Sequence, residues 1–117
     1  MSNRLKSTRF RELVTLYFQL QGIDTTAKPD NHGQLSEAIR YEGEVGDVHG
    51  VENWLVNVRN EGTRDLSGAL DEAHRDAKID EKKHAAVVFH RSSRGVGEHY
   101  VLISLADFAS ALAGGQK

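Results

Sequence analysis

Residues 54 to 90 constrain the fold of this chain more than any other part of its sequence. The segment Trp54 to Arg59 predicts a β-strand with Trp54, Val56 and Val58 on one face and the polar pair Asn57 and Arg59 on the other. The segment from about Asp65 to Lys78 carries small apolar residues at helical spacing. The run Ala85 to His90 is continuously apolar, which is typical of a strand covered on both faces. A strand, a helix and a strand in this order predict one right-handed βαβ crossover.

The N-terminal part predicts a helix and a hairpin beside this crossover. An amphipathic helix is expected from about Thr8 to before Gly22, with Ser7 or Thr8 as N-cap. Its predicted buried stripe consists of Phe10, Leu13, Val14, Tyr17 and Leu20. Residues 22 to 36 contain the one proline and many turn formers, and they predict a loop. A short strand at 38 to 41 and a turn at 42 to 47 then form a hairpin that places Asp47 at a strand edge.

The C-terminal part predicts a last strand at 99 to 103 and a short helix that ends at Ala113. Ser104 is the expected N-cap of this helix, and Asp107 stands at the capping-box position. The full order is α-β-β-β-α-β-β-α. It predicts a single-domain α/β sandwich with a mixed five-stranded sheet that covers residues 1 to 117.

Composition narrows the classes of function. With 38% hydrophobic and 27% charged residues, the 117 residues suit one globular domain. No cysteine is present, which excludes disulfides and thiolate zinc sites, and the six histidines show no HxH or HExxH spacing. No apolar run is long enough for a membrane span and no signal-peptide pattern is found, so a cytoplasmic protein is expected.

Two basic segments are candidates for contact with DNA phosphates. Residues 1 to 11 hold four basic residues and no acid, although an ordinary solvated terminus explains this cluster equally well. The loop that follows the apolar strand combines arginines, hydroxyls and glycines, which suits backbone contacts rather than base recognition. The candidate DNA-binding residues are Lys6, Arg9, Arg91, Ser92 and Arg94.

Several short motifs occur in an order that resembles a known family. They are Glu12, Gly46-Asp47-Val48-His49-Gly50, Asn57-Val58-Arg59-Asn60, Asp71-Glu72-Ala73, Val87-Val88-Phe89-His90-Arg91 and His99-Tyr100-Val101. Together they resemble the Holliday-junction-resolvase-like branch of the PD-(D/E)XK nucleases, and the small versions in actinobacterial phages look most similar. The resemblance implies a mixed-sheet, often dimeric protein that cleaves or binds branched or double-stranded DNA. It also implies a catalytic site with Asp47 and Glu12 as ligands of Mg²⁺ or Mn²⁺.

The central strand departs from the family pattern. Asn57 and Arg59 stand where the family has glutamate and lysine. Asparagine lacks the negative charge that draws a hard cation out of water, and arginine cannot act as a base. Catalysis is therefore expected to be weakened or lost. Glu72, or less favourably Asp71, could supply to the site the carboxylate that the strand lacks. The preferred interpretation is that both residues lie on a solvent-exposed face of their helix.

Two other hypotheses stay open at this point. In an active endonuclease with a rebuilt site, Asn57 would be a neutral metal ligand and Arg59 would stabilise the charge of the transition state. In the third hypothesis the fold serves as a protein-interaction module for a host factor. The net charge of −2 suits that third function better than tight DNA binding.

Overall fold

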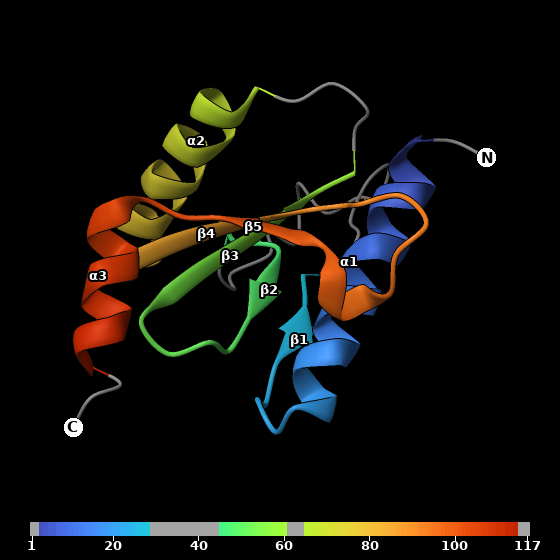
Figure 1. The fold of residues 1–117 in the computed structure, drawn as a ribbon, viewed down its shortest axis with the longest axis horizontal. Helices are drawn as coiled ribbons and strands as arrows, with labels where there is room; N and C mark the ends of the chain where they lie inside the picture. The colour runs from blue at the N-terminus through green and yellow to red at the C-terminus, as the bar shows by residue number, and fades with distance from the viewer. Residues whose placement is uncertain (1–2, 29–44, 61–64, 115–117) are drawn as a thin grey trace, which may run out of the picture.

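The computed structural model describes residues 3 to 28, 45 to 60 and 65 to 114 (Figure 1). Its helices in these residues are α1 (Asn3–Leu20), α2 (Leu66–Ile79), α3 (Leu105–Gly114) and the short 3₁₀ helix η1 (Val96–Glu98). Its strands are β1 (Thr26–Ala27), β2 (Val48–His49), β3 (Trp54–Arg59), β4 (His84–Phe89) and β5 (Tyr100–Leu102).

The five strands form one mixed sheet in the order β1-β2-β3-β4-β5. β1, β2 and β3 pair antiparallel, β3 and β4 pair parallel across the α2 crossover, and β5 returns antiparallel to β4. The predicted fold class is confirmed, because the chain is an α/β domain with this element order and a mixed five-stranded sheet.

The two faces of the sheet carry separate cores. Phe10 and Val14 of α1 pack against one face, where they meet four strand valines: Val48, Val56, Val58 and Val88. Ala73 and Ala77 of α2 pack against the other face, where they meet Leu55, Ala85, Val87 and Phe89. Ala73 and Ala77 are buried almost completely, as the predicted small-residue stripe requires, because a helix without bulky side chains can approach the sheet closely.

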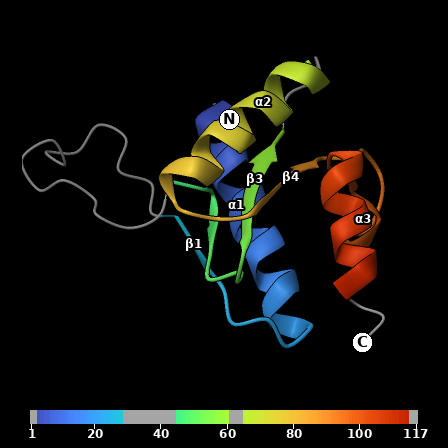
Figure 2. The same ribbon diagram turned by 90° about the vertical axis from the view of Figure 1, so that its left-hand side faces the viewer.

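α3 lies at the β5 end of the sheet (Figures 1 and 2). β5 pairs only with the second half of β4, from Val87 to Phe89, and leaves the first half of that edge unpaired. The carboxylate of Asp107 accepts a hydrogen bond from the backbone N–H of Ala85 (3.1 Å), so α3 satisfies a strand donor that β5 does not reach. Ser104 caps α3 as predicted, through its Oγ and the N–H of Asp107.

α1 differs from the predicted helix at its beginning and in its buried face. It already includes Ser7 and Thr8, because Arg4, Leu5 and Lys6 are good helix formers and no glycine or proline precedes Ser7. Of the predicted stripe, Phe10 and Val14 are buried, whereas Leu13, Tyr17 and Leu20 are exposed. The line of α1 that packs on the strand valines runs through Phe10 and Val14, with the partly buried Phe18 packed against this cluster.

The first strand also differs from the prediction. β1 lies at Thr26–Ala27, within the stretch predicted as a loop. A strand of two residues has no periodicity that the sequence could reveal. The strand predicted at 38 to 41 falls outside the described residues. In the part of the chain that the structure describes, no helix is long and apolar enough to cross a membrane.

Candidate functional site

The turn before β2 fixes the position of Asp47. The side chain of Asp80, just after α2, accepts hydrogen bonds from the N–H groups of Val45 (2.8 Å) and Gly46 (3.0 Å). Nε2 of His49 lies within hydrogen-bond distance of the carbonyl oxygen of Gly46, at 2.8 Å. Gly50 ends it with a φ of +97°, and a Cβ there would lie 2.6 Å from the carbonyl oxygen of Asp24. Glycine is required at that position, which explains part of the motif found in the sequence.

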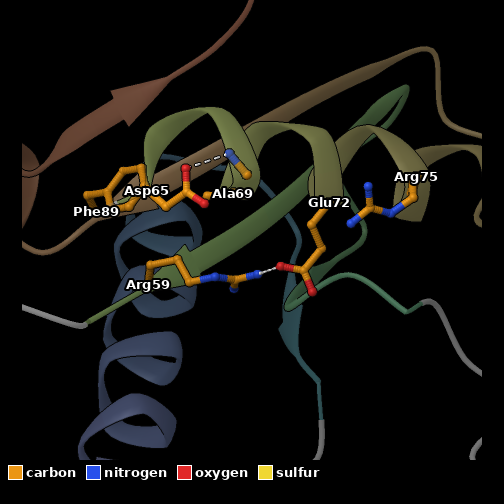
Figure 3. Close-up of a pocket in the computed structure, with 7 residues that line it drawn as sticks. Arg59, Asp65, Ala69, Glu72, Arg75 and Phe89 are labelled. Atoms are coloured by element: carbon orange, nitrogen blue, oxygen red, sulfur yellow. Dashed lines mark hydrogen bonds and ion pairs between the residues drawn. The ribbon is translucent and has the colours of Figure 1, made fainter. Parts of the chain in front are cut away.

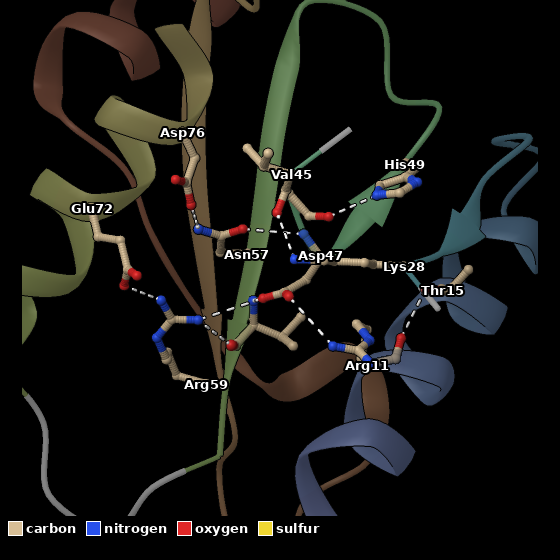
Figure 4. A network of polar contacts seen from close by, with 12 residues as sticks. Arg11, Thr15, Lys28, Val45, Asp47, His49, Asn57, Arg59, Glu72 and Asp76 are labelled. Atoms are coloured by element: carbon tan, nitrogen blue, oxygen red, sulfur yellow. Dashed lines mark hydrogen bonds and ion pairs between the residues drawn. The ribbon is translucent and has the colours of Figure 1, made fainter. Parts of the chain in front are cut away.

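Two arginines and one backbone donor surround the carboxylate of Asp47 (Figure 4). Oδ2 accepts a hydrogen bond from the N–H of Val58 at 2.9 Å and lies 3.5 Å from Nη1 of Arg59. Oδ1 lies 3.5 Å from Nη1 of Arg11 on α1. The Asp47 side chain is only 16% exposed, so protein groups rather than water neutralise its charge.

Asn57 and Arg59 lie beside Asp47, as their shared strand face predicts. Oδ1 of Asn57 accepts a hydrogen bond from the N–H of Asp47 (3.2 Å), and its Nδ2 donates to Asp76 on α2 (3.1 Å). Nη2 of Arg59 donates to Glu72, also on α2. Glu72 therefore pairs with an arginine rather than adding a carboxylate that faces Asp47, and Asp71 is exposed on the same helix.

Glu12 is not part of this network. Its side chain is exposed and lines a hollow of about 300 Å³ between α1 and β1, together with Thr15, Leu16, Gln19, Thr26 and Ala27. Asp47 does not line that hollow. The structure thus brings three of the four predicted catalytic residues together and leaves the fourth outside.

The residues around Asp47 do not fit Mg²⁺ or Mn²⁺. These cations need free carboxylate oxygens, but both oxygens of Asp47 face guanidinium groups and the Oδ1 of Asn57 is occupied by a backbone donor. Two permanent cations beside one carboxylate also repel a divalent ion. Among the described residues, no group of three or more histidine, aspartate or glutamate side chains could hold a metal.

Sequence reasoning missed three members of this network: Arg11, Asp76 and Asp80. Arg11 stands three residues before the buried Val14, on the flank of the α1 core line, which is the one signal that could have pointed to it. Its Nε is buried and has no hydrogen-bond partner among the described residues. Asp76 follows Glu72 by four residues on α2, and Asp80 follows by four more just after the helix, so the three acids face β3 and the turn before β2.

An open groove adjoins the network at the carboxyl ends of β3 and β4 (Figure 3). It measures about 410 Å³, and its lining residues are Arg59, Asp65, Gly68, Ala69, Glu72, Arg75 and Phe89. Asp65 caps α2 there by accepting a hydrogen bond from the N–H of Gly68 (3.0 Å). The positive charges of two arginines and the negative charges of two carboxylates cancel in this lining. The carboxylate of Asp65 already occupies the N-terminus of α2. The groove therefore offers little attraction to a polyanion.

The two basic segments predicted from the sequence meet at a cluster of three rings. Phe10 of α1 contacts the rings of His90 and His99 edge-on, with centroid distances of 5.2 and 5.0 Å. The two imidazoles lie 4.8 Å apart. This contact places Arg9, the neighbour of Phe10, close to the two ends of the loop that carries Arg91 and Arg94. Lys6 belongs to the same helix, and its side chain lies outside the described residues.

The loop from Arg91 to Glu98 has its own internal contacts. The N–H of Arg91 donates to Nδ1 of His99 (2.8 Å), which closes the loop at its base. Arg94 and Glu98 form an exposed ion pair at 3.6 Å, and Arg91 lies over the ring of Tyr100. Burial and the neighbouring His90 both lower the pKa of His99 from its ordinary 6.5, so its neutral form is favoured. Ser92 and Ser93 are exposed at the tip, and Ser93 adopts a φ of +63°.

Comparison of the chain with protein-family models, with curated proteins and with solved structures finds no match to any of them.

Proposed function

We propose that this protein binds double-stranded or branched DNA through the surface formed by α1 and the loop 91 to 98, and that it does so without metal-dependent hydrolysis. The observation that carries the proposal is the ring cluster of Phe10, His90 and His99. It joins the helix that bears Arg9 to the loop that bears Arg91 and Arg94, two segments that the sequence separates by about eighty residues.

The resemblance to resolvase-like nucleases supports the DNA-binding part. The element order that the resemblance implies is the order of this fold, from the helix with Glu12 through the Gly-Asp turn and the α2 crossover to the last strand. The exposed side chains of Arg9, Ser92 and Arg94 suit contacts to phosphate rather than to base edges. Binding should therefore depend on DNA shape more than on sequence.

The Asp47 network supports the absence of hydrolysis. In the nuclease hypothesis a carboxylate pair binds the cation, whereas here Arg11 and Arg59 lie against the two oxygens of the Asp47 carboxylate. Arg59 keeps the positive charge of the family lysine but cannot accept a proton. In the proposed function Asp47 positions the two arginines and holds the N–H of Val58, and it has no role in bond cleavage.

The test is DNA binding by fluorescence anisotropy, with labelled duplex and four-way junction in the presence of a chelator. Wild-type protein should bind with an affinity that falls steeply between about 50 and 200 mM salt. Arg94→Gln and Arg9→Gln should each weaken binding and reduce the salt slope by about 1. Lys83→Gln is the matched control, because it removes one exposed charge from a connector remote from the loop. Equal loss in all three variants would refute the assignment of the surface.

Metal binding and cleavage test the second half of the proposal. Calorimetric titration of Mn²⁺ into wild-type protein and into Asp47→Ala should give no saturable heat in either. Cleavage of junction and duplex substrates should remain absent when Mg²⁺ is added. Saturable Mn²⁺ binding that disappears in the variant, together with metal-dependent nicking, would establish the active endonuclease instead.

A further inference from the structure

The loop between β4 and β5 joins strand ends whose side chains alternate between the two faces of the sheet. Residues paired across an antiparallel ladder point to the same face, and Phe89 of β4 pairs with Tyr100 of β5. Phe89 belongs to the core that packs on α2, so Tyr100 lies on the α2 face. The next residues outward are His90 and His99, whose rings contact α1 on the other face. The loop therefore borders both faces of the sheet, and Figure 1 shows it beside α1.

On the α2 face, this end of the sheet carries an exposed aromatic ring with a cation over it. Tyr100 is 47% exposed, although its partner in the ladder, Phe89, is buried. The guanidinium carbon of Arg91 lies 5.1 Å from the centroid of the Tyr100 ring. Aromatic rings and the planes of arginine side chains are the surfaces on which proteins stack unpaired bases. The residues that follow at the tip of the loop are exposed as well: Ser92, Ser93 and Arg94.

We propose that Tyr100, together with Arg91, stacks an unpaired base of the DNA that the loop 91 to 98 contacts. The inference rests on the proposed DNA binding and adds a preference for DNA that contains an unpaired nucleotide. In a paired duplex the neighbouring bases cover both faces of each base, so none is offered to Tyr100. A base without a pairing partner leaves the stack at a lower cost. Every base has a face that can stack, so the preference is for unpaired bases and not for a sequence.

The surroundings of the Tyr100 ring suit a neutral base better than a phosphate chain. Phe89, its neighbour on the α2 face, lines the open groove of about 410 Å³. The charges in that groove cancel, so a phosphate chain gains little there, whereas stacking of an uncharged base needs no net positive charge. In the proposed complex the exposed Arg94 contacts the phosphates beside that base.

The test compares three labelled DNAs by fluorescence anisotropy in the presence of a chelator: a paired duplex, the same duplex with one unpaired nucleotide, and a fully paired four-way junction. Wild-type protein should bind the duplex with the unpaired nucleotide about tenfold more tightly than the paired duplex, because stacking of one base on an aromatic ring contributes a factor of this order. Tyr100→Leu should abolish this difference and leave the affinity for the paired duplex unchanged. Tyr100→Phe keeps the ring and should keep the preference.

Two controls separate stacking from other roles of Tyr100. Phe108→Leu is the matched variant, because Phe108 is also 47% exposed but lies on α3, and its substitution should leave the preference intact. The base analogue 2-aminopurine at the unpaired position reports stacking directly. Its fluorescence should fall when wild-type protein or Tyr100→Phe binds, and should not change when Tyr100→Leu binds. Circular dichroism of Tyr100→Leu should match the wild type, because the substituted side chain is exposed.

Failure of the inference and failure of the proposed function give different results. Absence of binding to all three DNAs overturns the proposed function and this inference with it. Binding to the paired duplex with no gain from the unpaired nucleotide overturns the inference alone. So does a gain that persists in Tyr100→Leu or that Phe108→Leu removes. A fully paired junction bound as tightly as the duplex with the unpaired nucleotide also overturns it, because the branch and not the unpaired base would then be recognised.

Discussion

Two aspartates hold this fold together in the same way but with different partners. Asp47 binds the N–H of Val58 on β3, and Asp107 binds the N–H of Ala85 on β4. Each also faces two basic side chains from other elements. The partners of Asp47 are Arg11 and Arg59, whereas those of Asp107 are His84 at 2.8 Å and His74 at 4.0 Å.

The two clusters differ in whether the basic partners of the aspartate carry a permanent charge. Arginine keeps its charge at every pH at which the protein is folded, whereas the charge of histidine depends on pH within the physiological range. The Asp47 cluster is therefore a permanent arrangement of charges, and its loss leaves cations that cannot be neutralised. The partners of Asp107 are imidazoles, so among the described residues that cluster holds no guanidinium. This contrast predicts different costs for what is formally the same substitution.

The largest effect is expected for Asp47→Ala. The substitution leaves Arg11 without its anion, Arg59 with only the exposed Glu72, and the Val58 N–H without its acceptor, and it should lower the free energy of unfolding by about 3 kcal/mol. Urea denaturation monitored by circular dichroism measures this change. Asp71→Ala is the control, because that aspartate is exposed and its loss should change stability by less than about 0.5 kcal/mol. Equal stability of both variants would show that Asp47 does not organise the network.

Asp107→Ala is expected to cost less, about 2 kcal/mol. It leaves the N–H of Ala85 buried without an acceptor and removes the contact of α3 with β4, but it leaves no guanidinium without its anion. The same urea experiment, made at the same pH as for Asp47→Ala, gives the comparison. If Asp107→Ala were the more damaging of the two, the nature of the cationic partners would not be what decides the cost.

The sequence predicted the fold well where elements are long and patterned. The crossover from Trp54 to His90 and the capped C-terminal helix occur where expected, because alternation, helical spacing and the Ser104 cap are local signals. It failed at β1, whose pairing is decided by β2, where Thr26 meets His49 and Ala27 meets Val48. It also misjudged the buried side of α1, since helical spacing alone does not distinguish Leu13 and Tyr17 from Val14, and the packing of the helix on the sheet decides which of them is buried.

The candidate site was predictable only along the strand. A spacing of two placed Asn57 and Arg59 on one face, and the glycine-flanked turn placed Asp47 beside them. Arg11, Asp76 and Asp80 come from helix faces whose rotation toward β3 depends on tertiary packing. For the same reason the neighbour of Glu12, and not Glu12 itself, reaches Asp47.

The pH dependence of stability sharpens the contrast between permanent and titratable partners. Burial alone raises the pKa of Asp107, but hydrogen bonds from His84 and the Ala85 N–H, with the charges of His84 and His74, hold it below its ordinary 3.8. The folded state therefore binds this proton less readily than the unfolded chain. The resulting stability is complete above pH 3.8 and is lost as the pH falls through the folded pKa.

His99 also makes the protein less stable as the pH falls, but at a higher pH than Asp107 does. Its lowered pKa means that the unfolded chain takes up a proton first, so stability should fall as the pH drops below 6.5 toward the folded pKa. Each step is the titration of one group and should be smaller than either alanine effect. Urea midpoints from about pH 7.5 to 3 would show both steps. His99→Gln should remove the first step and Asp107→Asn the second, and a first step that survives His99→Gln would assign it to another histidine.

The smallest effect is expected for the ion pair of Arg59 with Glu72. Comparing this exposed pair with the buried pair of Arg59 and Asp47 tests whether burial decides the strength of each interaction. Glu72 is 49% exposed, and water and salt screen its pairing with Arg59, so a double-mutant cycle of Arg59→Gln and Glu72→Gln should give a coupling of about 0.5 kcal/mol. The cycle of Arg59→Gln with Asp47→Asn should give a larger value, because that carboxylate is only 16% exposed. Raising the salt concentration should reduce the first coupling more than the second. Two couplings of equal size and equal salt dependence would mean that burial does not distinguish them, and that Asp47 anchors Arg59 no more firmly than a surface carboxylate does.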